Sequence, residues 1–182
     1  MIDAYQKLDT PTKLVFAGGS SHTNLYADQL RQRQSDRIRF LNWVSGEDLN
    51  ELLTHAALFA LPSDLEGLSL ALLDAMGAGV CVLTSDIPEN REVVEDAGFT
   101  FRAGDVNHLA HMLGVLLSHP EMRAAVVQSS KQRIKEQYLW PQIAAQIGQA
   151  YDQVAGRMDQ PEKRQPEKSS CATKPQTRGR VA

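Results

Sequence analysis

Residues 57–79 read ALFALPSDLEGLSLALLDAMGAG and contain the pattern around which the rest of the chain is arranged. The apolar run at 57–61 predicts a buried strand, which Pro62 ends. A nearly all-apolar helix is predicted over about 68–78, with Gly79 as its C-terminal cap. Open α/β sheets bind ligands where the carboxyl end of a strand leads into a helix, and helix N-termini favour phosphate. This stretch is therefore the first candidate for a binding site.

Two carboxylates, Glu66 and Asp74, interrupt this segment. Across a continuous helix their offset corresponds to ~12 Å, whereas the paired acids of glycosidases lie ~5 to ~9.5 Å apart. The spacing therefore favours two acids that contact one long ligand at separate points over a catalytic pair that acts on a single bond. Because a helix that is apolar on all sides is predicted to be buried, Asp74 is expected to face a cleft or a polar partner. The alternative is that Glu66 only interacts favourably with the helix dipole, as an acid in the first turn, and that Asp74 is a surface residue.

Strands and helices alternate through most of the chain. Further apolar runs predict strands at 13–17, 37–41, 80–84 and 99–101, and the strand at 37–41 has the alternating polarity of an edge strand. Residues 1–8 are predicted to be the end of a helix. Further helices are predicted over 24–34, with an apolar stripe of Leu25, Tyr26 and Leu30, and over 88–95. Others begin at a Ser45–Asp48 capping box, after an Asp105 cap, at Pro120 (to about 137) and at Pro141 (to about 156). This order predicts an α/β domain over 1–156 with a Rossmann-like parallel sheet and flanking helices. The polar segment 157–182 is predicted to be disordered.

Composition excludes several classes of protein. The chain has 182 residues and a net charge of −3, which gives no general signal for a nucleic-acid partner. The N-terminus lacks the apolar core of a signal peptide, and no window reaches the ~18 apolar residues of a membrane span. We therefore expect at most peripheral membrane association. Of the two cysteines, Cys81 lies in an apolar run and Cys171 in the polar tail, which predicts a reducing, cytoplasmic location.

Three weaker features were considered as sites. Gly18 and Gly19 follow a predicted strand and form either a plain turn or a loop that lets a nucleotide approach. Trp43 and Val44 follow the next strand and either bracket a base or pack. The histidines show no spacing typical of a metal site, so no metal is expected; they are His22, His55, His108, His111 and His119.

The segment LPSDLEGLSLALLDAMGAGVCVLTSDIPENREVV resembles the donor-binding part of GT-B glycosyltransferases, specifically the retaining family 4 group. That family has Pro-Ser, then Glu-Gly-x-Gly-x-x-x-x-Glu-Ala-Met-Ala-x-Gly, a strand, and a loop with Pro and Glu-Val. KLVFAGG, RIRFLNWV, EDLNELLTHAALFALPSD and FRAGDVNHLA also fall where the family has them, so the resemblance covers about residues 4–155. It implies transfer of a sugar from a nucleotide-diphosphate-sugar donor to an unknown acceptor, with retained configuration. It implies no cofactor.

The resemblance also implies roles for individual residues. Glu66 matches the family's first glutamate, which lies beside the donor sugar and phosphates and is the catalytic candidate. Asp74 stands where the second glutamate holds the ribose hydroxyls, and Val44 matches the region beside the nucleobase. The other donor-binding candidates are Gly67, Leu68, Ser69, Leu70, Gly18 and Gly19. Asp74 is one methylene shorter than the family's glutamate, and Ser69 replaces a glycine, so the fit to the donor differs in detail.

The family enzyme also has parts that this sequence does not match. These are an N-terminal acceptor-binding domain and a first strand of the donor domain, whose exit loop brings an arginine and a lysine to the diphosphate. In the family's strand order that strand lies between those predicted at 13–17 and 57–61, so these two would lack their shared neighbour. We expect half of a donor site and weak or absent catalysis by this chain alone. The alternatives are a binding or regulatory module, or a gene fragment, whose sheet a missing domain or partner chain completes, and a GT-B-like sugar epimerase.

Overall fold

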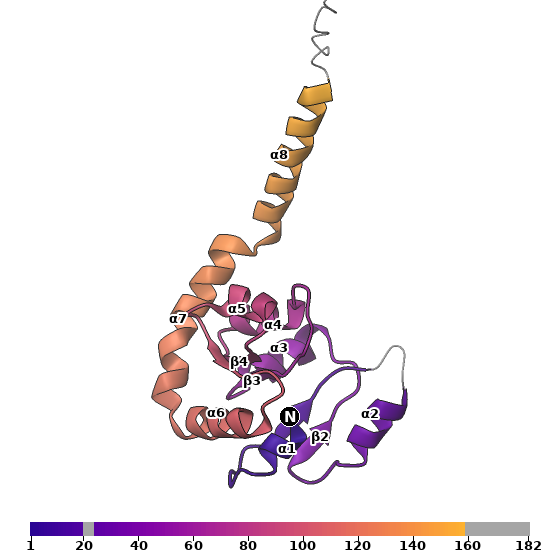
Figure 1. Ribbon diagram of the computed structural model, residues 1–182, viewed down its shortest axis with the longest axis vertical. Helices are drawn as coiled ribbons and strands as arrows, with labels where there is room; N and C mark the ends of the chain where they lie inside the picture. Colours follow the sequence, from indigo (N-terminus) through magenta and orange to yellow (C-terminus); the bar gives the residue numbers. More distant parts are fainter. Residues whose placement is uncertain (20–23, 159–182) are drawn as a thin grey trace, which may run out of the picture. The chain divides into compact units, whose positions relative to one another are not determined.

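The computed structural model describes residues 1–19 and 24–158. The strands are β1 (Leu14–Phe16), β2 (Ile38–Phe40), β3 (Phe59–Leu61), β4 (Val82–Ser85) and β5 (Phe99–Phe101). The helices are α1 (Ile2–Tyr5), α2 (Asn24–Arg31), α3 (Gly46–Thr54), α4 (Leu70–Ala78), α5 (Pro88–Val94), α6 (Val106–Ser118), α7 (Pro120–Gln137) and α8 (Trp140–Met158). The alternation of strands and helices up to β5 confirms the predicted α/β class (Figure 1).

The strands form two separate parallel sheets in the described part of the chain. β1 pairs with β2, with Leu14 opposite Ile38, and β2 is an edge strand as predicted. The second sheet has the order β3-β4-β5, with Phe59 opposite Val82 and Leu83 opposite Phe99. No described strand joins β1 to β3. This separation agrees with the expectation that these two strands lack a shared neighbour.

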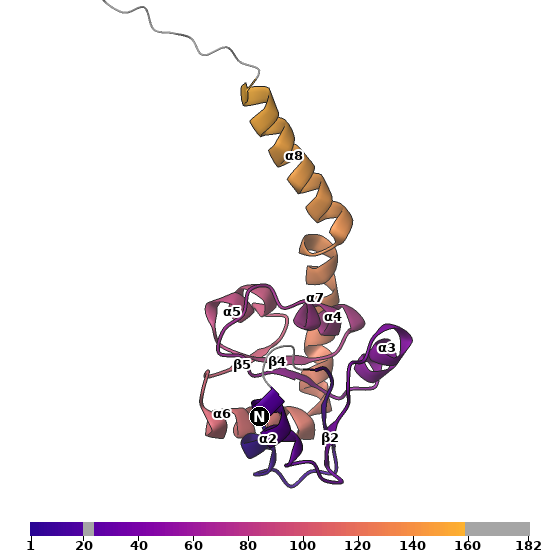
Figure 2. The same cartoon turned by 90° about the vertical axis from the view of Figure 1, so that its right-hand side faces the viewer.

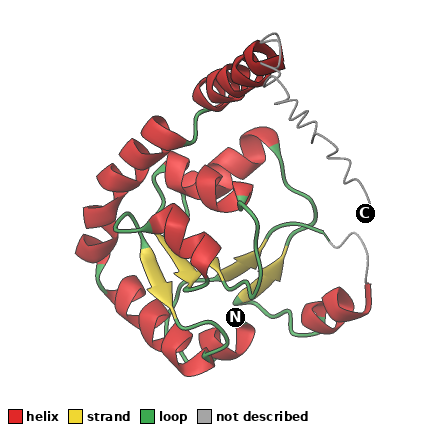
Figure 3. Ribbon diagram, turned by 45° about the horizontal axis from the view of Figure 1, so that its top comes forward, coloured by secondary structure: helices red, strands yellow, loops and turns green. Residues whose placement is uncertain are grey.

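The three-stranded sheet is covered by helices on both faces, as Figures 2 and 3 show. Side chains of successive residues in a strand point to opposite faces. Accordingly Val82 packs in one core with residues of α3, α4 and α5, and Leu83 packs in another with residues of α1 and α6. All four residues of β4 are buried. Burial on both faces explains why Val82 and Leu83, which point to opposite faces, are both apolar.

Helix α4 ends as the sequence predicts and packs against α7. Gly79 caps the helix in the left-handed region, with φ +82°, which costs a glycine nothing because it has no Cβ. The Ser130 hydroxyl of α7 donates a hydrogen bond to the Met76 carbonyl at 3.3 Å, and both residues are buried. A Cβ on Gly79 would lie 2.2 Å from Cε of Lys131. The glycine is therefore required by the left-handed backbone, while the Lys131 side chain could move away from a Cβ at this position.

Two predicted features of the helices are wrong. Ser45 is the N-cap of α3, but its side chain accepts no capping hydrogen bond. Gly46 enters the helix with φ +61°, so the first turn lacks the regular geometry that brings an amide to the cap oxygen. In α2, Leu25 and Tyr26 are exposed and do not form part of a buried stripe.

The chain divides into two compact units with a boundary after Ile143. In the second unit the described residues are helical and belong to α8, whose apolar side chains at Ile147, Tyr151 and Val154 are exposed. The helix continues to Met158, so disorder from 157 onward is wrong for the first two residues. The rest of that predicted tail, 159–182, lies outside the described residues. Across 1–19 and 24–158, no helix combines the length and apolar character needed to cross a membrane.

Candidate functional site

The loop between β3 and α4 carries the first predicted acid. Glu66 is half-buried, and its Oε1 accepts a hydrogen bond of 2.6 Å from the Ser63 hydroxyl. Helix α4 begins at Leu70 and not at about 68, so Glu66 lies in the loop that precedes it. The ~12 Å offset to Asp74 required a continuous helix and therefore does not apply. The hydroxyl holds one carboxylate oxygen and leaves the other available to a ligand.

A buried network of hydrogen bonds connects this loop to the end of β4 and to α5. The Ser85 hydroxyl, at the end of β4, donates to the Ser63 carbonyl. Asn90 Nδ2 donates to Ser85 Oγ at 3.1 Å and to the Ser85 carbonyl at 3.3 Å. Ser85 and Asn90 are each only 1% exposed. Sequence analysis missed both residues, although the polar Ser85 at the end of an apolar run was a signal for the first; Asn90 lies in α5.

The N-terminus of α4 presents unpaired backbone donors. Ser69 is the N-cap, and its hydroxyl accepts from the Leu72 amide at 3.4 Å. The amides of Leu70 and Ala71 occupy the first two helical positions and have no acceptor one turn earlier within the helix. The exposed side chains of Leu65, Leu68 and Leu70 surround this terminus. The combination of free amides and exposed apolar groups is typical of a surface that binds an anionic ligand with apolar parts.

Asp74 lies one turn further along α4 and is exposed. The prediction that α4 is buried on all sides is wrong, because only the face of Leu72, Ala75 and Met76 is buried. Asp74 and Ala71, which share a helix face, line a cavity of about 1250 Å³. The exposure of Asp74 agrees with the alternative that it is a surface residue. It also lines the cavity, so it is open to a ligand there.

The cavity extends between the two sheets. Ala17 and Pro62, which follow β1 and β3, both line it. Val44 is half-buried and lines it as well, whereas Trp43 is 80% exposed and does not pack in the core. Near the strand ends the cavity thus brings together Val44 and Asp74, with the Glu66 loop following β3.

The remaining donor-binding candidates lie elsewhere. Gly18 and Gly19 are exposed just after β1 and are not among the residues that line the cavity. Gly18 has φ +131°, and its amide donates to the Asn42 carbonyl at 3.2 Å. Ser20 and Ser21, which complete the predicted turn, lie outside the described residues. The Gly18 amide therefore ties the end of β1 to the segment that follows β2.

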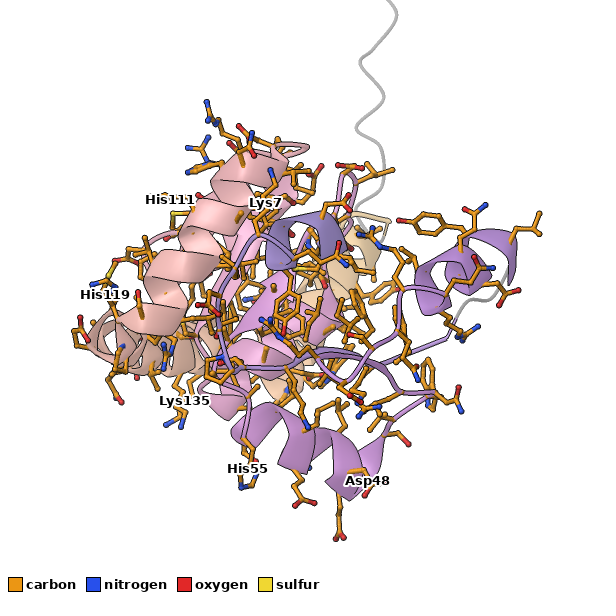
Figure 4. All side chains as sticks on the ribbon, turned by 90° about the horizontal axis from the view of Figure 1, so that it is seen from below. Lys7, Asp48, His55, His111, His119 and Lys135 are labelled. Carbon is orange, nitrogen blue, oxygen red and sulfur yellow. The ribbon has the colours of Figure 1, made fainter. Side chains whose placement is uncertain are left out.

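Other chemistry-bearing residues do not form a cluster. No group of three or more His, Cys, Asp or Glu residues suited to a metal ion occurs in the described part of the chain. Figure 4 shows His55, His111 and His119 spread over the surface. The ring Nδ1 of His108 lies 2.9 Å from the Arg102 amide and accepts its hydrogen bond. Burial raises the pKa of the Cys81 thiol to about 11, so this thiol is protonated and unreactive.

Comparison with known proteins decides the family. Residues 1–133 match the family model described as glycosyl transferases group 1. The chain belongs to this family. O-antigen chain mannosyltransferase B of Escherichia coli is 32% identical over 158 residues, which are 83% of this chain and 41% of that relative. MMP alpha-(1->4)-mannosyltransferase of Mycolicibacterium hassiacum is 31% identical, over 68% of this chain and 31% of the relative.

Solved structures of other glycosyltransferases share the fold. Anabaena HepE in complex with UDP-glucose superposes with a TM-score of 0.77 at 20% identity, over 84% of this chain and 44% of that one. The C-terminal domain of a group 1 glycosyl transferase, LpcC of Francisella tularensis, gives 0.60 at 14% identity, over 75% of this chain and 90% of that one. The chain thus spans less than half the length of the two curated relatives.

Proposed function

We propose that this chain binds the nucleotide-diphosphate-sugar donor of a retaining glycosyltransferase, with the N-terminus of α4 as the diphosphate site. The observation that carries the proposal is the pair of unpaired amides at Leu70 and Ala71, with the Glu66 carboxylate before them and Asp74 one turn after them. Oriented helix amides favour phosphate charge. Family membership supports this choice of ligand over other anions.

Each acid then has a separate role along the donor. The Asp74 carboxylate accepts hydrogen bonds from the ribose hydroxyls, and Val44 contacts the base from the cavity wall. The free oxygen of Glu66 accepts a hydrogen bond from a hydroxyl of the donor sugar. The backbone at Gly67, Leu68, Ser69 and Leu70 meets the sugar and the diphosphate. Gly18 and Gly19 approach the nucleotide only at the margin of this site.

The reaction breaks the bond between the anomeric carbon and the diphosphate and forms a new bond to an acceptor oxygen, which loses its proton. Negative charge grows on the departing diphosphate, so preorganised amides lower the barrier. Of the lysines and arginines, only Lys13 lines the described cavity, and it precedes β1, away from the carboxyl ends of the strands. The described cavity wall therefore offers the diphosphate no lysine or arginine near the carboxyl ends of the strands, and we expect transfer by this chain alone to be weak or absent.

We further propose that the donor site works without a metal ion and that the protein acts in the cytoplasm, without nucleic acid and with at most peripheral membrane contact. The helix amides take the charge-stabilising role that a metal has in other transferases. Donor affinity measured with EDTA is then equal to that measured without it. A tenfold loss of affinity in EDTA contradicts a metal-free site.

Calorimetric titration with UDP-glucose and with GDP-mannose tests the proposed site. We expect millimolar to high-micromolar affinity for one of them. Asp74→Ala and Glu66→Ala should each weaken it about tenfold, which is roughly 1.4 kcal/mol. Asp96→Ala is the matched control, because Asp96 is an exposed acid between α5 and β5. Equal binding by all three variants and the unaltered chain rejects the assignment.

A further inference from the structure

Within the described residues, the Glu66 carboxylate has one hydrogen-bond partner, and this partner is neutral. Its Oε1 accepts a hydrogen bond from the Ser63 hydroxyl at 2.6 Å. The ion pairs of the described chain do not include Glu66. A serine hydroxyl carries one proton, so a hydroxyl that donates to Glu66 has none left for a ligand. Ser63 therefore orients the carboxylate without neutralising it.

The loop around Glu66 adds little to this restraint. Residues 62–69 lie between β3 and α4 and belong to neither a helix nor a strand. The side chains of Leu65 and Leu68 are exposed and do not form a packed wall beside the acid. A long, flexible side chain such as glutamate loses much rotamer freedom when it is fixed. The hydrogen bond from Ser63 thus selects one orientation of Glu66 before a ligand binds, which favours binding.

Ser63 is held in place through its own backbone. Its carbonyl accepts the Ser85 hydroxyl, and the Ser85 oxygen accepts from Asn90 at 3.1 Å. Ser85 and Asn90 are both buried, so this support does not depend on exposed groups. The carbonyl of Ser63 is therefore tied to the end of β4, while its hydroxyl is directed to the acid in the loop.

The contact with Ser63 uses one of the two oxygens of Glu66. In the proposed site the other oxygen accepts a hydrogen bond from a hydroxyl of the donor sugar. The amides of α4 and the Asp74 carboxylate contact the diphosphate and the ribose, which a nucleotide diphosphate without a sugar also has. A change that acts only on Glu66 should therefore alter the affinity for the nucleotide sugar and leave the affinity for the free nucleotide diphosphate as it is.

We propose that Ser63 is a positioning residue for the donor sugar. Its hydroxyl holds Glu66 in the orientation that binds a sugar hydroxyl. Ser63 thereby makes the site bind a nucleotide-diphosphate sugar more tightly than the nucleotide diphosphate that remains after transfer. The inference rests on the proposed donor site and adds that the part of the affinity due to the sugar depends on Ser63.

Calorimetric titration of the full chain with UDP-glucose, UDP, GDP-mannose and GDP tests the inference. The measured quantity is the ratio of the dissociation constant of each nucleotide diphosphate to that of its sugar. Ser63→Ala removes a hydrogen bond to a charged group and should lower this ratio about three- to tenfold for the donor that binds. The affinities for UDP and GDP themselves should not change.

Two further variants separate positioning from a merely structural role. Ser63→Thr keeps a hydroxyl at this position and should restore the ratio measured for the unaltered chain. Ser129→Ala is the matched control, because Ser129 is also half-buried and its hydroxyl donates to the Val126 carbonyl at 3.0 Å within α7. This control should leave the affinities for all four ligands unchanged.

A double variant tests whether Ser63 acts through Glu66. If the hydroxyl only positions this carboxylate, its removal has no further effect once the carboxylate is gone, so the two losses do not add. Ser63→Ala combined with Glu66→Ala should therefore bind the nucleotide sugar as weakly as Glu66→Ala alone.

Three results overturn the inference while the donor site stands. They are additive losses in the double variant, an equal loss of affinity for the nucleotide diphosphate and for its sugar in Ser63→Ala, and a Ser63→Thr variant that binds like Ser63→Ala. Failure of the donor site itself gives a different result. In that case the unaltered chain binds neither nucleotide sugar, or Glu66→Ala binds as tightly as the unaltered chain, and both the site and the role of Ser63 are rejected.

Discussion

β4 and β1 are both short strands in parallel sheets, yet their surroundings differ. β4 is paired on both edges, and each of its four residues is buried. β1 is paired only with β2, and Val15 at its centre is 39% exposed. An apolar strand sequence predicts a buried strand, but only two neighbours and two covered faces provide the burial. The three-stranded region should therefore carry most of the stability of the first unit.

Truncation of one apolar side chain in each region should give the largest difference in stability. Met76→Ala removes a fully buried side chain of α4 and should cost about 2–5 kcal/mol in the free energy of unfolding. Val15→Ala should cost less than about 1 kcal/mol, because the side chain is already partly exposed. Urea unfolding followed by circular dichroism measures both. Equal costs would show that Val15 is as well buried in solution as Met76, and thus that the cavity beside β1 is closed.

Removal of the buried network should have the next largest effect. Asn90→Ala leaves the buried Ser85 hydroxyl without its donor and should cost about 1–3 kcal/mol. Because Ser85 holds the Ser63 carbonyl, donor affinity should also fall. Asn107→Ala, on the exposed side of α6, is a control in the same assays. Donor affinity that remains at the unaltered value in Asn90→Ala contradicts the supporting role of this network.

Substitution of two glycines by alanine should change stability in opposite directions, and the first of them tests the cap of α4. Gly79→Ala forces a Cβ into the left-handed region and against Lys131, and it should cost about 1–2 kcal/mol. Gly148→Ala, inside α8 with nothing near the new Cβ, should raise helix stability by about 0.5–1 kcal/mol. Thermal unfolding of both variants gives the comparison. A neutral Gly79→Ala would mean that α4 ends differently in solution.

The smallest effect concerns the cap of α6 and depends on pH. The hydrogen bond from the His108 amide to Asp105, at 2.8 Å, lowers the pKa of this carboxyl below its ordinary value of 3.8. A lowered folded-state pKa means that the stabilisation is present above the unfolded-state value and is lost as the pH falls through the folded-state one. Asp105→Asn should therefore be less stable than the unaltered protein at pH 7 and should differ from it less and less below pH 4. A constant difference across this range contradicts the assignment.

Much of the fold follows from local patterns. The strand at 99–101 and the Asp105 cap agree with the sequence, because each depends on residues close together in the chain. The other four strands were predicted within one or two residues at each end, and Gly79 caps α4 as expected. The Ser45 cap failed because the backbone of its neighbour Gly46 is left-handed, which no side-chain pattern reveals.

The site was less accessible to sequence reasoning. The sequence singled out Glu66 and Asp74 as acids in an apolar segment, and the family resemblance gave them roles, but the exposure of Asp74 depends on how α4 packs. The support from Ser85 to Ser63 joins residues 22 positions apart. Such long-range contacts leave no periodic signal. The separation of the strands into two sheets was expected only from the family's strand order.

Amide chemical-shift mapping of ¹⁵N-labelled protein with UDP-glucose and GDP-mannose tests the central claim most directly. The amides of Gly67, Ser69, Leu70 and Ala71 should shift in a saturable manner, and the same shifts should require several times more ligand in Asp74→Ala. Amides of β5 and α7 should not move. Saturable shifts confined to Gly18 and Gly19, or no shifts at the N-terminus of α4 with either donor, would contradict the assignment of this helix as the donor site.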